Sequence, residues 1–317
     1  KRKTPMIYTE EQVFMNTIIR LQIISSKGTV FTKNKAKEAF SFFDMVVGKF
    51  SRFNPKSELS EMNNSYPKAF TSSKELFALV KLSLELNKKG KGFYDPTLID
   101  LLENYGYDKK QDFSCLENPD FYKEMQKLVK NRKNPKDIEL NEKTRTIKLQ
   151  KGQRIDLGSI AKGYAVDLAY DFLIKDFDNF LINAGGDVRV GGVNEQGLPW
   201  KIMLYKAPLP NQSDCGKEFL GMVEIEPGVS IASSGGWARR VGTFHHLLNP
   251  VDGLPINQIS QTYVIAPNAT CADAYSTFLF VEGPDAIPII VKDGFSGLLI
   301  DFQGNIFKSK KFNYISI

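Results

Sequence analysis

The chain has 317 residues, of which 42% are hydrophobic, so it is long enough to bury a substantial core. Its formal charge of +6 comes from scattered lysines without interleaved aromatic residues, a pattern that argues against a nucleic-acid partner. The three cysteines are odd in number and far apart, which argues against a disulfide framework and a cysteine-rich metal site. No run of about eighteen apolar residues occurs, so we expect no transmembrane span in this chain.

In the N-terminal part, apolar periodicity predicts a strand and two helices. The run 14–24 is apolar and β-branched enough for a strand, and the apolar spacing over about 34–47 predicts a helix with one buried face. A polar loop over 51–60 follows. A second helix is expected over 75–88, with Ser72 as its N-cap.

The rest of the chain alternates irregularly between helices and pairs of strands. Residues 108–136 are charged and rich in asparagine, so we interpret them as a peripheral insertion in a single domain over 1–317. Alternating apolar residues predict a strand pair over 200–205 and 219–225. This irregular order favours an α+β fold over a regular doubly wound sheet.

Three glycine-rich turns could approach a phosphate or a metal: 156–159, 184–187 and 233–236. A glycine after a strand usually just closes a turn, so none of them defines a site alone. None fits the Rossmann or P-loop spacing, which disfavours an ordinary NAD or nucleoside-triphosphate site. The first turn precedes a helical pattern, and free N–H groups at a helix start, together with Lys162, can bind an anion.

A carboxylate and a hydroxyl near the C-terminus have spacing that suits a metal site. If 269–277 is helical, Asp273 and Thr277 fall at i and i+4 on one face, where their oxygens suit Mg²⁺, and we expect Asp273 to lie outside the core. The only histidines, His245 and His246, are adjacent. Either both are hydrogen-bonded strand residues, or one is a general base or a phosphate ligand. The pattern by itself indicates an anion-binding enzyme that could hold a metal.

Six segments, taken in order along the chain, resemble the signature blocks of the ApbE family of FAD:protein FMN transferases. They are 51–60, 93–97, 155–167, 181–190, 233–235 with 245–250, and 264–283. The resemblance implies an α+β fold of the ApbE or T-fold-like type, with mixed sheets and packed helices, that binds FAD with Mg²⁺. It also implies transfer of FMN from FAD to a threonine or serine hydroxyl of an acceptor protein, with release of AMP.

The resemblance also carries site residues over by position. The positions that match FAD contacts are Met15, Phe53, Tyr94, Asp95, Asp156, Lys162 and Leu247. The metal positions are Ser159, through its backbone oxygen, and the side chains of Asp273 and Thr277. As acceptor of the hydroxyl proton, His246 is our first candidate and His245 the second, with an aspartate of the site as the alternative base.

Three positions depart from the family pattern. Asn16 stands where members often have glycine, Gly236 where they have aspartate, and Phe53 where they have tyrosine. The change at Gly236 leaves one polar contact of the pattern in doubt. Phe53 keeps the aromatic ring and loses the hydroxyl, so we expect stacking to survive and any hydrogen bond to be lost.

Two other functions fit the same residues: an Mg²⁺-dependent FAD pyrophosphatase, in which water replaces the acceptor, and a flavin-binding protein without turnover. The family commonly works outside the cytoplasmic membrane, and this chain starts at Lys1 without a methionine. We therefore expect an extracytoplasmic protein whose precursor carries an export or lipoprotein segment that anchors it to the cell membrane.

Overall fold

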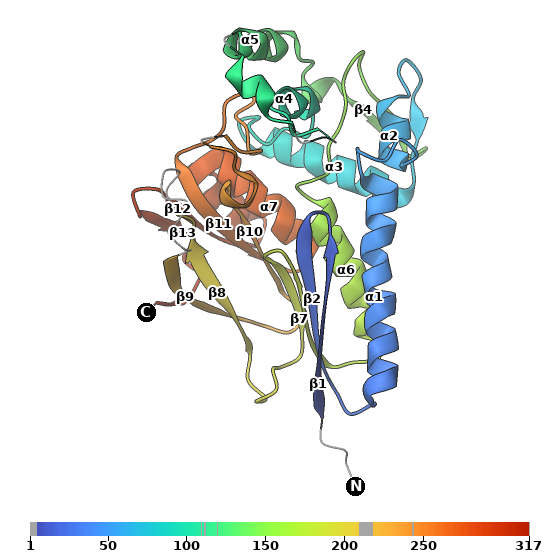
Figure 1. The fold of residues 1–317 in the computed structure, drawn as a ribbon, viewed down its shortest axis with the longest axis vertical. Coiled ribbons are helices and arrows are strands. Elements are labelled where there is room, and N and C mark those ends of the chain that lie inside the picture. The colour runs from blue at the N-terminus through green and yellow to red at the C-terminus, as the bar shows by residue number, and fades with distance from the viewer. Residues whose placement is uncertain are drawn as a thin grey trace.

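The computed structural model describes residues 5–108, 110, 112–118, 120–208, 218–242 and 244–316. Its centre is an eight-stranded antiparallel sheet with the order β1-β2-β6-β7-β10-β11-β12-β13 (Figure 1). These strands are β1 (Met6–Phe14), β2 (Thr17–Ser25), β6 (Asn179–Ala184), β7 (Asp187–Gly191), β10 (Ser230–Ser234), β11 (Ile259–Ala266), β12 (Ser296–Asp301) and β13 (Ile306–Lys308).

The described residues also form two three-stranded sheets. The first, in the order β14-β9-β8, consists of β14 (Ile315–Ser316), β9 (Glu218–Ile225) and β8 (Trp200–Lys206). The second, in the order β3-β5-β4, consists of β3 (Phe70–Thr71), β5 (Thr146–Lys148) and β4 (Glu139–Asn141). The strand pair expected over 200–205 and 219–225 is therefore confirmed as β8 and β9.

Three long or central helices, α1 (Thr29–Phe50), α6 (Ala161–Leu173) and α7 (Ala269–Glu282), pack beside one another on one face of the central sheet (Figure 1). The remaining α-helices are α2 (Glu58–Asn63), α3 (Lys74–Lys89), α4 (Ile99–Asn104), α5 (Phe121–Asn131) and α8 (Ile287–Lys292). Short 3₁₀ turns are η1 (Ser114–Glu117), η2 (Pro135–Asp137), η3 (Trp237–Arg239) and η4 (Gly283–Ala286). The mixture of separate helices and antiparallel sheets confirms the expected α+β class.

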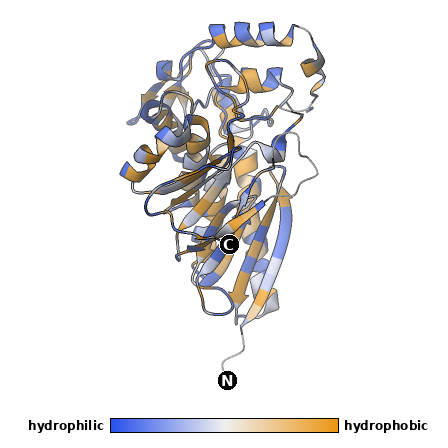
Figure 2. Cartoon of the chain, turned by 90° about the vertical axis from the view of Figure 1, so that its left-hand side faces the viewer, coloured by the Kyte–Doolittle hydropathy of each residue, from blue (hydrophilic) through white to orange (hydrophobic). Residues whose placement is uncertain are grey.

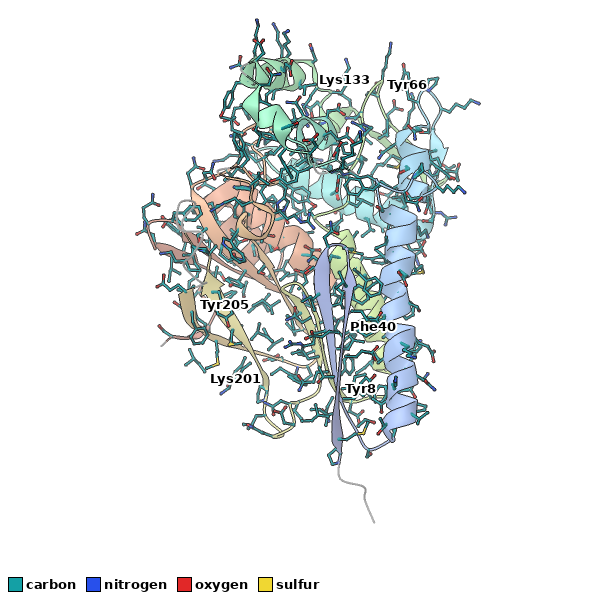
Figure 3. All side chains as sticks on the ribbon, viewed as in Figure 1. Tyr8, Phe40, Tyr66, Lys133, Lys201 and Tyr205 are labelled. Atoms are coloured by element: carbon teal, nitrogen blue, oxygen red, sulfur yellow. The ribbon has the colours of Figure 1, made fainter. Side chains whose placement is uncertain are left out.

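The central sheet has a hydrophobic core on each face. Neighbouring residues of β11 show the division, because Val264 belongs to the core under the helices and Tyr263 to the core that faces β8 and β9. On the helix side, Phe40 of α1 points toward the β1–β2 hairpin and stacks on Phe14, with ring centroids 6.1 Å apart (Figure 3). Figure 2 shows how hydrophobic and hydrophilic residues alternate along the strands near the N-terminus.

The strand expected over 14–24 is present as β2, which begins at Thr17, and β1 precedes it to form a hairpin. Met15 and Asn16 form its two-residue turn with φ values of 51° and 57°, the left-handed conformation typical of such hairpins. We did not predict β1, because its inward positions include Glu10 and Gln12, which interrupt the apolar alternation. Gln12 donates a side-chain hydrogen bond to Glu10, so the two polar groups satisfy each other.

Helix boundaries also differ from expectation at two places. Helix α1 begins at Thr29 rather than near residue 34. Ser73, and not Ser72, caps α3 by accepting a hydrogen bond from the backbone N–H of Leu76. The Ser72 hydroxyl instead donates to the carbonyl of Arg145, which ties the start of the helix to the β3-β5-β4 sheet.

Helices α4 and α5 form a small separate core at the top of the molecule in Figure 1. Tyr105 and Phe121 stack edge to face, with centroids 5.0 Å apart, and both contact Phe244. Leu248 lies in the same core. The segment expected to be a peripheral insertion thus packs directly on the stretch that carries His245 and His246. Among the described residues, no helix combines the length and apolar character needed to cross a membrane.

Candidate active site

The three glycine-rich turns of the sequence meet at one end of the sheet. Gly186, between β6 and β7, lies so close to the end of β10 that a Cβ on it would be 2.6 Å from Ser233 Oγ. The Lys162 ammonium, just after the 156–159 turn, forms an ion pair with the Asp187 carboxylate. Turns that are far apart in the sequence therefore line one site.

The turn before α6 is held by the carboxylate of Asp156. Its Oδ1 accepts a hydrogen bond from Gly158 N over 2.5 Å, and its Oδ2 pairs with Arg52 Nε at 2.7 Å. Backbone N–H groups at the helix start are engaged as well, since Ala161 N donates to Leu157 O. Fewer free N–H groups are therefore available to bind an anion at this helix start than expected. The ammonium of Lys162 remains the main positive group there.

Lys162 lies between two carboxylates. Besides its ion pair with Asp187, its Nζ is 3.8 Å from Asp273 Oδ1. Asp187 is fully buried, and apart from that ion pair neither of its oxygens has a hydrogen-bond partner in the described part of the chain. Burial lowers the pKa of the Lys162 ammonium, whereas the nearby Asp273 carboxylate opposes this shift. Two buried carboxylates with spare lone pairs thus face one lysine side chain.

The expectation that Asp273 lies outside the core is wrong, because only 4% of the residue is exposed. Helix α7 is buried on most sides, so the face that carries Asp273 packs against the start of α6. There Asp273 Oδ2 accepts a hydrogen bond from Gly163 N over 2.9 Å. Thr277 lies one turn further along, and its hydroxyl is 3.1 Å from Ser234 Oγ.

Ser276 is a residue of this cluster that the sequence analysis missed. Its hydroxyl is 2.7 Å from Ser234 Oγ and also donates to the carbonyl of Asp273. Its spacing of three residues from Asp273 was the available signal, since i and i+3 share a helix face. The α7 face therefore presents a carboxylate and two hydroxyls together.

Tyr94 supports the turn that contains Ser159. The two hydroxyls are 2.7 Å apart, and burial raises the pKa of Tyr94 to about 12, so its phenol stays protonated. Asp95, its neighbour, is engaged elsewhere: its Oδ2 accepts a hydrogen bond from Arg132 at 2.5 Å, and its Oδ1 accepts from Thr97. With its side chain only 4% exposed, the Asp95 carboxylate fixes this segment and has little capacity left for a ligand.

Three further positions, Phe53, Met15 and Leu247, were matched to FAD contacts. Phe53 is 42% exposed, and the guanidinium of Arg52 lies 4.2 Å from its ring centroid. Met15 is at the tip of the β1–β2 hairpin and packs partly against the main core. Leu247 is buried, and its N–H donates to the ring of His245.

A small polar depression adjoins the Arg52 side of the site. It is lined by Arg52, Ser60, Asn63, Asn64, Ile99, Glu103 and Arg154. Arg154 pairs with Glu103 at 2.7 Å, and Arg52 joins the depression to Asp156. The two guanidinium groups that line the depression thus already have carboxylate partners.

The structure gives the two histidines different surroundings. In His245, Nδ1 accepts from the N–H of Leu247 and Nε2 donates to the carbonyl of Ile256, each over 3.2 Å. These contacts require the neutral tautomer with its proton on Nε2. Burial, with a contribution from Arg240, lowers the pKa of His245 to about 4. Both ring nitrogens are committed to the backbone, as expected of a structural histidine.

His246 has a ring nitrogen to spare. Its Nδ1 is buried and has no hydrogen-bond partner among the described residues. The ring of Tyr107 packs against it edge to face, with centroids 6.3 Å apart. Burial holds the pKa of His246 well below its ordinary value, and the charge of Arg239 adds to the effect. His246 is therefore neutral at neutral pH and has a lone pair or a proton available for a ligand.

Comparison with known proteins decides the family. The sequence pattern of the ApbE family matches residues 15–299. The chain belongs to the ApbE family. Among solved structures, the ApbE protein of Thermotoga maritima superposes with a TM-score of 0.82 at 27% identity and covers 97% of this chain and 98% of its own. The flavin transferase ApbE of Vibrio cholerae superposes with a TM-score of 0.81 at 22% identity, with the same coverage. The expected ApbE fold is confirmed.

Named relatives of this ApbE-family chain are transferases. A FAD:protein FMN transferase of Haemophilus influenzae is 27% identical over 306 residues, which is 93% of this chain and 87% of the relative. A second FAD:protein FMN transferase, from Vibrio cholerae, is 26% identical over 280 residues, which is 86% of this chain and 80% of the relative. The similarity thus extends over nearly the whole length of both proteins.

One departure of this ApbE-family member has a structural reason. A Cβ on Gly236 would lie 2.6 Å from Cδ2 of His245. In this backbone conformation, the aspartate that family members often carry here would collide with the ring. The glycine lets the 235–240 segment approach the buried histidine.

Proposed function

We propose that this enzyme transfers FMN from FAD to a threonine or serine hydroxyl of an acceptor protein and releases AMP, with Mg²⁺ as its metal. The observation that carries the proposal is the position of the Lys162 ammonium between the Asp187 and Asp273 carboxylates. Phosphoryl-type transfer depends mainly on positioning and charge neutralisation. A lysine beside carboxylates that can hold a divalent cation supplies both the positioning and the charge neutralisation. The FAD:protein FMN transferases among its relatives support the same activity.

The donor set fits Mg²⁺. Apart from the ion pair with Lys162, neither oxygen of Asp187 has a hydrogen-bond partner among the described residues, and Asp273 adds a second buried carboxylate. The Thr277 hydroxyl and the Ser159 backbone carbonyl are further candidate oxygen donors. Among the described residues, no three His, Cys, Asp or Glu side chains gather as a metal centre of their own, so hydroxyl, carbonyl or water oxygens must complete the shell. Bound Mg²⁺ would neutralise charge on the pyrophosphate of FAD.

Residues of this chain bind the substrate and accept the proton. Lys162 binds a pyrophosphate oxygen, and the Tyr94–Ser159 contact keeps its turn in place. His246 accepts the proton of the acceptor hydroxyl through a ring nitrogen, because its ring is neutral and its Nδ1 is unpartnered. His245 is unsuited to that role, since both of its nitrogens are bonded to the backbone.

The proposal is tested with the purified chain, FAD, Mg²⁺ and a peptide that carries one threonine. We expect covalently bound flavin on the peptide, a mass increase of FMN less one water, and AMP in equal amount. The matched peptide with Thr→Ala should stay unlabelled, because alanine offers no nucleophile. Chelation of the metal by EDTA should stop both products.

Two outcomes would replace the proposal. Release of AMP and free FMN at the same rate without a peptide would make water the nucleophile and the protein a pyrophosphatase. Unchanged FAD in every reaction, with FAD still bound, would indicate a flavin-binding protein without turnover.

A further inference from the structure

Two ion pairs of opposite polarity join α6 to β7. In the pair at the candidate active site, α6 supplies the Lys162 ammonium and β7 the Asp187 carboxylate. Further along, α6 supplies the Asp167 carboxylate and β7 the Arg189 guanidinium, with Nη1 2.7 Å from Oδ1. Asp187 and Arg189 share the strand face toward α6, because Val188 between them lies in the core that faces β8 and β9. A slip of α6 along β7 would bring like charges together, so the two pairs fix the helix on the strand.

The Asp167 carboxylate also caps the start of α7. Its Oδ1 accepts a hydrogen bond from Ala269 N over 2.7 Å, and its Oδ2 accepts from Thr270 N over 2.8 Å and from Thr270 Oγ1 over 2.5 Å. A carboxylate at a helix N-terminus satisfies free N–H groups and interacts favourably with the helix dipole. The Asp167 side chain is only 14% exposed. One carboxylate therefore connects α6, β7 and α7.

Arg189, the partner of Asp167, is itself fixed by neighbouring elements. Its Cζ lies 3.8 Å from the ring centroid of Tyr170, which belongs to α6. Its Nε donates to the carbonyl of Gly228, just before β10, over 3.3 Å. The guanidinium is thus held between β7, α6 and the segment that enters β10, so its ion pair with Asp167 has little freedom to rearrange.

These connections adjoin the candidate metal site. Asp167 lies one helical turn after Gly163 on the same face of α6, and Gly163 N donates to Asp273 Oδ2 over 2.9 Å. Asp273 lies one turn after Ala269, whose N–H bonds to Asp167. Helices α6 and α7 are therefore joined at two successive turns. Loss of the Asp167 contacts would let the start of α7 shift relative to Lys162.

We propose that Asp167 and Arg189 are positioning residues that set the spacing of the Asp187 and Asp273 carboxylates, and with it the affinity of the candidate Mg²⁺ site; this inference rests on the function proposed above. Both residues act through the elements that carry the carboxylates. Mg²⁺ requires nearly octahedral geometry with about 2.1 Å to each oxygen, so a small displacement of one carboxylate weakens binding. Replacement of a residue that orients metal ligands typically lowers metal affinity by about ten-fold to a hundred-fold.

Three substitutions test the inference. Asp167→Asn keeps the size of the side chain, but its NH₂ group cannot accept from an α7 N–H. Arg189→Gln removes the anchor on β7 and leaves the contacts with α7, whereas Arg189→Lys retains the charge. The matched control is Asp176→Asn, because Asp176 follows the other end of α6 and pairs with Lys35 of α1 at 3.0 Å.

The first measurement is a calorimetric titration of Mg²⁺ into the chain saturated with FAD, without an acceptor peptide. We expect the affinity for Mg²⁺ to fall about ten-fold or more in Asp167→Asn and in Arg189→Gln. Arg189→Lys should lose less, since the ion pair can still form. Asp176→Asn should bind Mg²⁺ like the wild type.

The second measurement needs neither metal nor FAD. Exchange of the Gly163 N–H with solvent, followed by NMR, reports its hydrogen bond to Asp273 Oδ2. We expect exchange to be about ten-fold faster in Asp167→Asn and unchanged in Asp176→Asn. The N–H of Leu76, which donates to Ser73 Oγ at the start of α3, should keep its wild-type rate in both variants. A general loss of stability would instead accelerate the exchange of both amides.

Wild-type Mg²⁺ affinity in Asp167→Asn would overturn the inference, and so would an equal loss of affinity in Asp176→Asn. A wild-type chain that binds no Mg²⁺ would instead refute the metal of the proposed function. The exchange measurement would still decide the role of Asp167 in that case, because an unchanged rate for Gly163 in Asp167→Asn would show that Asp167 does not position α7.

Discussion

The backbone N–H of Gly163 donates to Asp273 Oδ2 over 2.9 Å, so the candidate metal ligand of α7 is held by the first turn of α6. This contact requires a close approach of the two helices. A Cβ on Gly163 would lie 2.8 Å from Asp273 Cβ and would also collide with the carbonyl of Ala269. The position of Asp273 therefore depends on a glycine more than a hundred residues earlier in the chain.

We predict that Gly163→Ala destabilises the protein by about 1–3 kcal/mol, because α6 and α7 must separate to admit the methyl group. Chemical denaturation measures the change. Gly48→Ala is the control: Gly48 lies inside α1, and a Cβ there meets no atom within 4 Å, so we expect a gain of up to about 1 kcal/mol. Equal effects of the two substitutions would contradict the close packing at Gly163.

Asp273→Asn should depress flavin transfer by orders of magnitude, because it removes one charge from the proposed Mg²⁺ site. The amide oxygen can still accept from Gly163 N, so we expect the fold to survive even though Asp273 is buried. Transfer rates measured over a range of Mg²⁺ concentrations test this. Thr277→Val should lower the rate less, because a neutral hydroxyl stabilises bound Mg²⁺ less than a carboxylate does. Exposed Asp285, which pairs with Lys91, gives the control Asp285→Asn. Normal turnover of Asp273→Asn at low Mg²⁺ would remove Asp273 from the site.

His246→Ala should lower kcat for transfer by about a hundred-fold to ten-thousand-fold, the usual effect of losing a general base. FAD affinity, measured by flavin fluorescence, should change much less, because the proton moves only in the transition state. Equal losses of affinity and turnover would identify His246 as a binding residue.

The pH profile follows from the surroundings of His246. Burial and Arg239 hold its pKa well below the ordinary value, and a general base works in its deprotonated form. The acid limb of kcat/KM for FAD should therefore lie below pH 6.5, and a limb at or above that value would argue against His246 as the base. Bound pyrophosphate is anionic, so the acid limb of kcat should lie at higher pH than that of kcat/KM.

The stability of the protein should fall in acid because of His245. Its pKa is about 4 in the folded protein, below the ordinary value of 6.5, so the unfolded chain takes up a proton first as the pH drops. Stability is retained above pH 6.5 and is lost progressively down to about pH 4, and the loss at pH 5 should be about 2 kcal/mol. In His245→Gln, the difference in unfolding free energy between pH 8 and pH 5 should shrink by that amount. An undiminished difference would place the acid sensitivity elsewhere.

Local sequence patterns predicted most of the elements near the site. The helices over 34–47 and 75–88 and the strands over 200–205 and 219–225 are present, because their apolar residues recur with the period of the element that they form. The pattern failed at β1, where Glu10 and Gln12 occupy half-buried positions and bond to each other. A polar pair that satisfies itself inside a fold has no signal in hydrophobic periodicity.

The sequence by itself determined the α+β class, the glycine-rich turns and the kinds of side chain available for the chemistry, since these depend on periodicity and residue type. Only the tertiary structure decided which distant residues meet. It pairs Lys162 with Asp187 and Asp95 with Arg132. It also shows that both ring nitrogens of His245 are bonded to the backbone, whereas the buried Nδ1 of His246 has no hydrogen-bond partner among the described residues. Periodicity tells which face of an element is buried. Strand order and helix packing set which residues of other elements lie against that face, and those contacts decide the charge, burial and free lone pairs of each side chain.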